Sequence, residues 1–258
     1  MTVPAHTVAD DSAQKESVSY DPDLAVTAAL IADPTRATML RAMLAGRPLA
    51  AGELARLAGV SAATASFHLA KLLDGNMITA ARQGRHRYYR LAGHEIAAAL
   101  EAIGSISTAL PVRSLRQSRE AAALSEARTC YDHLAGRAGV GLLDAMLSQG
   151  LLAQDRSAGR TSRGESTGTQ FTVTAAGTAA LASFGVDLLE VRRSRRIFAG
   201  ECIDWTQRRG HLNGALGAAI TARLFERGWI TRGPRRRSVL VTEAGAQGLA
   251  DTFGLDLG

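Results

Sequence analysis

Apolar residues recur at helical spacing through the first part of the chain. The segment LAVTAALIA, which begins at Leu24, is apolar, and Asp33-Pro34-Thr35 interrupts it. The helical pattern then resumes at Met39, Leu40, Met43 and Leu44. Gly46-Arg47-Pro48 follows directly and ends the second helix that this pattern predicts.

A short helix, a tight turn and a longer helix come next. Leu54 and Leu57 form the apolar face of the short helix, and Gly59-Val60-Ser61 separates it from the longer one. Ser61 can cap the longer helix, because its hydroxyl can accept a backbone N–H of the first turn. The apolar positions of this longer helix include Ala65, Leu69, Leu72 and Leu73.

Two strand-like runs follow, from Met77 to Ala81 and from His86 to Leu91. The polar loop between them, Arg82-Gln83-Gly84-Arg85, contains a glycine and predicts a β-hairpin. A last helix is predicted from His94 to Leu110, where Pro111 ends it. Elements in this order predict a winged helix-turn-helix, whose longer helix fits the major groove of B-DNA while the hairpin reaches the flanking backbone or minor groove.

The sequence from ADPTRATMLRAML through ELARLAGVSAATASFHLAKLL to GRHRYYRL resembles the ArsR-type family of bacterial winged-helix repressors, over about residues 22 to 110. The resemblance implies a homodimer assembled through its terminal helices, a palindromic operator in double-stranded DNA, and release of the DNA by an effector. Many members carry a cysteine-rich metal motif in the helix before the turn. This chain has Glu53-Leu54-Ala55-Arg56-Leu57 there, so the resemblance does not extend to that metal site.

The C-terminal half contains two related segments. Each has an apolar helix, a strand, an arginine-rich loop, a strand ending in Val-Thr and a glycine three residues later, at Gly177 and Gly245. Each copy reads as a helix with a wing-like hairpin, which predicts a tandem of winged-helix-like modules. A Cys-x-Asp motif precedes each copy, as Cys130-Tyr131-Asp132 and Cys202-Ile203-Asp204. These segments resemble the C-terminal extension of long ArsR-type proteins, which by itself implies no function.

The predicted fold class is mainly α with small β-hairpins (α+β). Residues 1–20 lack apolar periodicity and are predicted to be a disordered tail. Residues 21–111 form the predicted winged helix-turn-helix domain. Residues 112–258 form the predicted C-terminal domain, with repeats at about 112–188 and 189–258.

Composition narrows the class of protein. The 258 residues are 46% hydrophobic and 21% charged, which excludes a wholly disordered chain. No stretch approaches the roughly 20 apolar residues of a spanning helix, and the N-terminus lacks a signal peptide, so a cytoplasmic protein without membrane contact is predicted. The net charge of +6 indicates an acidic partner such as nucleic acid.

The DNA contacts are predicted to come from the longer helix and the wing. Hydroxyls can bind phosphates or base edges, Ala63 can contact a thymine methyl, and a lysine suits a phosphate. The candidates on the helix are Ser61, Ala63, Thr64, Ser66, Phe67, His68 and Lys71. Those on the wing are Arg82, Gln83, Arg85, Arg87 and Tyr88. Two alternatives stay open: Phe67 packs in the core, and the wing is only a solvated hairpin.

Two further arginine runs lie in the C-terminal half. One is Arg192-Arg193 with Arg195-Arg196, and the other is Arg235-Arg236-Arg237. They extend the DNA contact, bind an acidic effector, or form a solvated surface, and the sequence favours the last.

The two cysteines are far apart in the chain, so one bridge, a thiol sensor or two core cysteines all remain open. The two Cys-x-Asp segments are predicted to meet at one junction. Its candidate effector-pocket residues are Cys130, Tyr131, Asp132, His133, Cys202, Asp204, Trp205 and His211. No cofactor is predicted: treated as helices, neither segment supplies a metal site alone, and a site using Cys130 and His133 with Cys202 and Asp204 or His211 is the less favoured alternative.

The sequence therefore predicts a homodimeric, sequence-specific DNA-binding transcriptional regulator, a repressor released by an effector. The alternative is a thiol- or small-molecule-binding sensor in which the C-terminal half dominates. No glycine-rich phosphate loop or nucleophile elbow is present, and an enzyme is not predicted.

Overall fold

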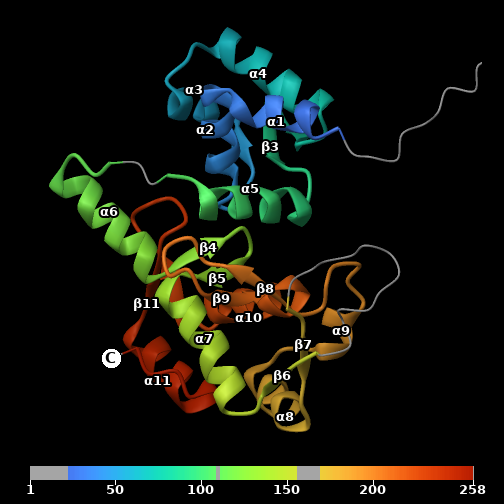
Figure 1. Ribbon diagram of the computed structural model, residues 1–258, viewed down its shortest axis with the longest axis vertical. Helices are drawn as coiled ribbons and strands as arrows, with labels where there is room; N and C mark the ends of the chain where they lie inside the picture. Colours follow the sequence, from blue (N-terminus) through green and yellow to red (C-terminus); the bar gives the residue numbers. More distant parts are fainter. Residues whose placement is uncertain (1–22, 109–110, 156–168, 258) are drawn as a thin grey trace, which may run out of the picture.

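The computed structural model describes residues 23–108, 111–155 and 169–257 (Figure 1). The predicted tail, residues 1–20, and the end of the predicted helix, residues 109–110, lie outside the described residues. The N-terminal half contains α1 (Leu24–Ala32), α2 (Pro34–Met43), β1 (Leu49–Ala50), α3 (Ala51–Ala58), α4 (Ala62–Asp74), β2 (Ile78–Gln83), β3 (His86–Leu91) and α5 (His94–Ile106). This is the predicted winged helix-turn-helix order.

Local chemistry sets the helix starts of this half. Asp33 caps α2, where its carboxylate accepts the Arg36 backbone N–H at 2.9 Å and Pro34 occupies the first turn. Ser61 caps α4 in the same way. Gly59, with φ +67°, ends α3 in the left-handed conformation that glycine adopts without steric cost.

The wing is longer than predicted. Strand β2 continues to Gln83, because Arg82 pairs with Arg87 and Gln83 with His86 across the hairpin. The turn therefore contains only Gly84 and Arg85, and Gly84 has φ +59°. Strand β1 adds a third strand beside β3.

The C-terminal half repeats the order hairpin, helix, hairpin, helix. After α6 (Leu115–Glu126), the first unit contains β4 (Arg128–Cys130), β5 (His133–Ala135), α7 (Gly136–Ser148), β6 (Leu152–Gln154), β7 (Phe171–Val173) and α8 (Ala175–Phe184). After α9 (Leu188–Arg192), the second contains β8 (Gly200–Ile203), β9 (Gly210–Asn213), α10 (Gly214–Glu226), β10 (Ile230–Arg232), β11 (Val239–Val241) and α11 (Glu243–Phe253). The Cys-x-Asp segments thus lie on hairpins, and treating them as helices was wrong.

The two units share one hydrophobic core. Leu142 and Phe184 of the first unit pack in the same cluster as Leu216 and Phe253 of the second. The units also exchange backbone hydrogen bonds: Val239 N donates to Ala127 O at 2.9 Å and, symmetrically, Phe171 N donates to Ala199 O at 3.0 Å. The two units therefore pack together as a single structural unit.

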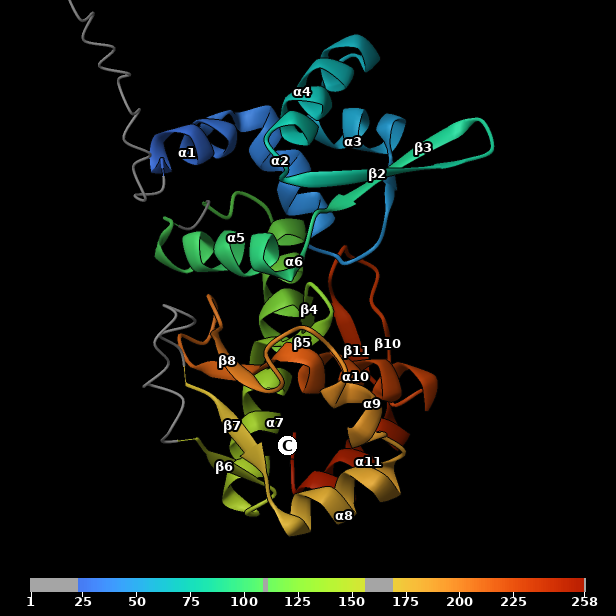
Figure 2. The same ribbon diagram turned by 90° about the vertical axis from the view of Figure 1, so that its right-hand side faces the viewer.

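Helix α5 lies between the winged half and the C-terminal half (Figures 1 and 2). The turn of the β4–β5 hairpin reaches the winged core, where Tyr131 N donates to Leu44 O at 3.1 Å. Tyr131 has φ +60°, and its carbonyl lies against Gly46, where a Cβ would clash with it. Both halves are therefore in direct contact, with α4 at the end remote from the C-terminal half.

Candidate functional site

Helix α4 presents a polar face of small residues at the end of the molecule. Its buried residues are Ala65, Leu69 and Leu72. The predicted contacts that are exposed are Ser61, Ala63, Thr64, Ser66, Phe67 and Lys71. Exposed hydroxyls at the start of a helix whose outer face is open to solvent suit insertion into a major groove.

Phe67 and His68 have different surroundings. Phe67 is 57% exposed, with the Lys71 ammonium 4.8 Å from the ring centre, so packing of Phe67 in the core is ruled out. His68 is half-buried, and its Nδ1 lies 3.5 Å from the Asp33 carboxylate at the start of α2. His68 is therefore directed toward the body, unlike the rest of the predicted set.

The wing projects from the winged half beside α3 and α4 (Figure 2). Arg82, Gln83, Arg85 and Arg87 are exposed, whereas Tyr88 is half-buried and pairs with Ala50 of β1. Within the described part of the chain, Arg82, Arg85 and Arg87 form no ion pair with a carboxylate. Their charges are available to phosphate groups.

The arginines in the β10–β11 loop, unlike those of the wing, are paired with carboxylates. Each of them reaches a different glutamate: Arg235 pairs with Glu120 at 2.8 Å, Arg236 with Glu53 at 3.9 Å, and Arg237 with the buried Glu101. Arg237 Nε also donates to Thr129 O at 2.9 Å. These arginines hold the β10–β11 loop against α3 and α5 of the winged half and against α6, so the prediction of a solvated surface was wrong for this run.

In the other run, Arg196 is similarly engaged. It binds both oxygens of Asp132, with Nη1 at 2.5 Å and Nη2 at 3.1 Å. Arg192 lies over the Phe198 ring at 4.1 Å, and Arg193 pairs with Glu190 on the surface.

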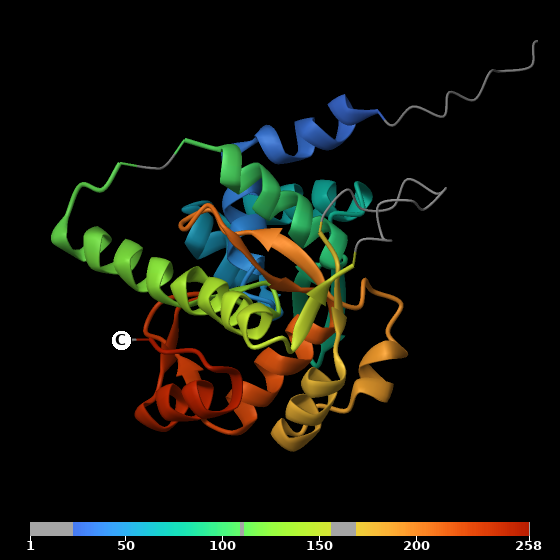
Figure 3. The ribbon, with the colours of Figure 1, turned by 60° about the horizontal axis from the view of Figure 1, so that its bottom comes forward.

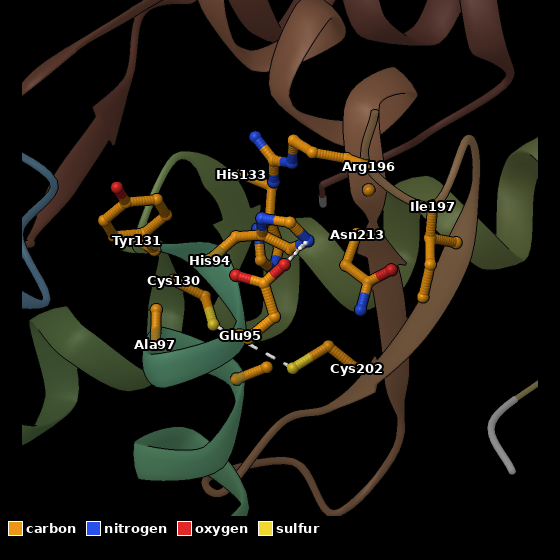
Figure 4. A pocket seen from close by; sticks show the side chains of 12 residues that line it. His94, Glu95, Ala97, Cys130, Tyr131, His133, Arg196, Ile197, Cys202 and Asn213 are labelled. Atoms are coloured by element: carbon orange, nitrogen blue, oxygen red, sulfur yellow. Dashed lines mark hydrogen bonds and ion pairs between the residues drawn. The ribbon is translucent and has the colours of Figure 1, made fainter. Parts of the chain in front are cut away.

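The structure brings the two Cys-x-Asp segments together beneath α5. Cys130 and His133 are cross-strand partners on β4 and β5, and Cys202 and His211 are cross-strand partners on β8 and β9. The two thiols lie 4.0 Å apart (Figure 4). The two imidazole rings stack with their centres 5.0 Å apart. We call Cys130, His133, Cys202 and His211 the junction cluster.

A cavity of about 140 Å³ adjoins this cluster. Its walls include Cys130, Tyr131, His133 and Cys202 from the predicted pocket. The other walls come from His94, Glu95, Ala97 and Ala98 of α5 and from Arg196, Ile197, Asn213 and Gly214. The cavity thus lies between the last helix of the winged half and the two hairpins of the C-terminal half.

Asp204 and Trp205 lie elsewhere. Asp204 is fully buried, pairs with the fully buried Arg128 at 2.9 Å, and accepts the Gly136 N–H at 2.6 Å. The Trp205 ring stacks on the Arg128 guanidinium at 4.5 Å. Neither residue lines the cavity, and both lie behind the hairpins. Asp132 and His211 of the predicted pocket also lie outside its wall.

The protonation states of the buried groups follow from these contacts. The hydrogen bond with Cys202, and burial, raise the pKa of the Cys130 thiol well above its ordinary value. Burial and the neighbouring His133 lower the pKa of His211 well below its usual range, so its imidazole is neutral. Burial acts to raise the pKa of Asp132, but hydrogen bonds from His133 and Arg196 lower it to about 2. For Asp204, Arg128 outweighs burial in the same way and the pKa is about 2.

A repeated motif in the sequence marks the junction cluster. Each unit contains His-Leu-x-Gly, at His133-Leu134-Ala135-Gly136 and His211-Leu212-Asn213-Gly214. Gly136 and Gly214 have φ +76° and +83°, which turns each hairpin into its helix. Aligning the repeats on this motif would have paired the histidines. No comparable signal identifies Arg196 or the α5 residues of the cavity.

Comparison with known proteins gives consistent matches. The profile of a family described as a helix-turn-helix domain matches residues 31–79. The chain is 39% identical over 225 residues to the uncharacterized HTH-type transcriptional regulator YdfF of Bacillus subtilis (strain 168), covering 87% of this chain and 94% of that protein. No helix among the described residues is long and apolar enough to cross a membrane.

Solved structures match about a third of the chain. NolR from Sinorhizobium fredii is 28% identical, with a TM-score of 0.31 over 33% of this chain and 85% of its own. The homodimeric winged helix-turn-helix domain Mb0332 from Mycobacterium bovis, a possible ArsR-family regulator, is 30% identical, with a TM-score of 0.29 over 31% of this chain and 72% of its own.

Proposed function

Because this chain belongs to the ArsR-type winged helix-turn-helix transcriptional regulators, which bind DNA, we propose that it is a homodimeric repressor of a palindromic operator and that an effector releases it. One observation carries the proposal: the exposed polar face of α4 lies beside a wing whose Arg82, Arg85 and Arg87 lack carboxylate partners among the described residues. Helix α4 would read base edges and the wing arginines would neutralise phosphates.

Two apolar helices support the dimer. Helix α1 is apolar along its length, yet no residue of it is buried, and Leu24 and Val26 are 76% and 60% exposed. Helix α5 also exposes Ile103 and Ile106 at its C-terminal end. Both helices lie on the same side of the winged half (Figures 2 and 3). A second copy that covers this side would remove the exposed apolar surface from water and place two α4 helices on a two-fold axis.

The cavity between α5 and the cysteine hairpins is the proposed effector site. Binding there would displace α5, which the proposed dimer uses, and so change the spacing of the two α4 helices. The effector can release the DNA only if its affinity for the protein differs between the two arrangements of the α4 helices. The C-terminal half, a tandem of winged-helix-like modules in this proposal, senses the effector in the cytoplasm. The proposed function is binding, without catalysis.

The alternative is a sensor whose C-terminal half dominates and whose affinity for DNA is secondary. The Arg235, Arg236 and Arg237 pairs favour the coupled arrangement, because they tie the C-terminal half to α3 and α5 of the DNA-binding half. A small molecule retained on purification, together with weak and sequence-independent DNA binding, would favour the sensor.

The wing can be tested by replacing Arg85 and Arg87 together with alanine. Each lost phosphate contact should reduce the slope of log K against log salt by about 0.9, and the affinity for the operator should fall by about tenfold or more. Fluorescence anisotropy of a labelled operator duplex, titrated at several salt concentrations, measures both quantities.

Arg119→Ala is the matched control, because Arg119 is an exposed arginine of α6 in the C-terminal half. It removes one positive charge remote from the wing and should leave the salt slope unchanged. Equal slopes for the double variant and the native protein would contradict the role of the wing.

A further inference from the structure

We propose that the junction cluster is a tetrahedral Zn²⁺ site, with Cys130 and His133 as ligands from the first unit and Cys202 and His211 from the second. One atom of each side chain, a thiol sulfur or an imidazole nitrogen, lies within 4.8 Å of all the others. The sequence favoured no metal and left this set, with Asp204 or His211 as the fourth ligand, as the less favoured alternative.

The geometry matches the dimensions of zinc coordination. With Zn–S bonds of about 2.3 Å, two thiolates of a tetrahedral site lie about 3.8 Å apart. The two sulfurs here are 4.0 Å apart. Two sulfurs and two imidazole nitrogens in tetrahedral positions are typical of zinc among the metals that proteins bind.

Unpartnered nitrogen atoms of the histidines supply an independent argument. His133 Nε2 and both ring nitrogens of His211 are buried without a hydrogen-bond partner among the described residues. His133 is 7% exposed and His211 is fully buried. A buried imidazole without a partner is costly, whereas a metal bound to a ring nitrogen satisfies its lone pair.

A carboxylate lies near the Nδ1 atom of each histidine. Asp132 Oδ1 lies 3.4 Å from His133 Nδ1, and Asp204 Oδ2 lies 4.0 Å from His211 Nδ1. In zinc sites the second ring nitrogen is commonly held by a carboxylate, which fixes the tautomer and directs the other nitrogen to the metal. Asp132 is itself fixed by Arg196, and Asp204 by Arg128. They are positioning residues in this proposal.

The packing of the two repeats fixes the histidines in place. A Cβ on Gly139 of α7 would lie 3.6 Å from His211 Cβ, and one on Gly217 of α10 would lie 3.3 Å from His133 Cβ. The helix of each unit thus abuts the histidine of the other unit. Thr221 of α10 also accepts the Leu134 N–H at 2.9 Å. The site therefore requires both units in their docked arrangement.

The net charge of the site and the cavity beside it also suit the binding of a zinc ion. Binding releases the thiol protons of Cys130 and Cys202, and two thiolates neutralise one divalent cation, so the buried site carries no net charge. The cavity beside Cys130, His133 and Cys202 gives the ion a path from the surface. Bound zinc would cross-link the two hairpins that face α5.

The test uses the full chain, purified with reductant, stripped with a chelator and titrated with Co²⁺ and then Zn²⁺. We expect one ion per chain, thiolate-to-cobalt charge transfer with the intense ligand-field bands of tetrahedral Co²⁺, and loss of these bands when Zn²⁺ replaces it. Zn²⁺ should also raise the melting temperature. Absence of these bands in the native chain overturns the proposal, whatever the behaviour of variants.

Variants identify the ligands. Cys202→Ser should at least halve the charge-transfer band, because Cys130 is then the one thiolate left in the site. Asp132→Asn should weaken Zn²⁺ affinity by about 10- to 100-fold while the tetrahedral spectrum remains. His86→Gln, at an exposed histidine of the wing, is the matched control and should bind as the native chain does. Unchanged binding in Cys202→Ser, or a Cys130–Cys202 disulfide with no metal uptake after its reduction, overturns the assignment.

Discussion

Replacing Asp204 with alanine is expected to lower the free energy of unfolding by about 3–5 kcal/mol. The change leaves the Arg128 guanidinium, 0% exposed, without its counter-charge, and breaking one partner of a buried ion pair is far costlier than removing a surface pair. Gly136, Thr206 and Gln207 also lose the oxygen to which their backbone or hydroxyl groups donate. Urea denaturation monitored by circular dichroism measures the difference.

Asp144→Ala is the matched control. Asp144 pairs with Arg209 at 2.7 Å, but both side chains are about half exposed, so this pair should contribute no more than about 1 kcal/mol. If the two variants were destabilised equally, the Arg128–Asp204 pair would not be the structural centre that its burial indicates.

Replacing Gly245 with alanine should also destabilise the protein, by about 3 kcal/mol. Alanine normally favours a helix over glycine by about 1 kcal/mol, so the expected sign is the reverse of helix propensity. The reason is contact: a Cβ at Gly245, in the first turn of α11, would overlap the carbonyl of Trp229, the residue before β10. Gly177 has the equivalent contact with the Leu151 carbonyl in the first unit.

The Gly52→Ala variant measures the effect of helix propensity without a packing clash. Gly52 lies in α3, and a Cβ there would have no atom within 4 Å, so alanine should stabilise the protein by about 0.5–1 kcal/mol. Urea midpoints of both variants give the comparison. Stabilisation by Gly245→Ala would show that α11 can move away from Trp229 at little cost.

Gly177 and Gly245 also show which parts of the fold could be predicted from the sequence. The repeated Thr-x-x-Gly was visible as a pattern, and its cause is local: Thr174 and Thr242 cap α8 and α11 by accepting the Gly177 and Gly245 N–H at 3.0 Å. The winged half was predictable for the same reason, because capping residues and apolar periodicity act over a few residues.

The junction could not be predicted in this way. A spacing of three places Cys130 and His133 together on one helix face, and also opposite each other across a two-residue turn. Strands of three residues carry too little alternation to decide between these conformations. The spacing of nine puts Cys202 and His211 on opposite faces of a helix but allows them to pair across a hairpin. Comparison of the two repeats therefore favours the hairpin, which the first repeat alone leaves undecided.

The sequence also could not predict which arginines pair with carboxylates. The run at Arg235 and the wing at Arg85 are both short, basic and flanked by glycine or polar residues. The difference is tertiary: Glu53, Glu101 and Glu120 come from three distant helices to pair with the first, whereas no carboxylate of the described residues pairs with the second. Basic composition alone does not identify a DNA-binding surface.

The central claim is that two copies of the winged half read one operator. Footprinting on DNA upstream of the gene, near physiological salt, with light scattering on the same sample, tests it most directly. We predict a dimer that protects two half-sites centred about 34–36 Å, or about 10 base pairs, apart. A monomer that protects one half-site, or a protein that gives no footprint at concentrations where non-specific binding begins, would contradict the claim.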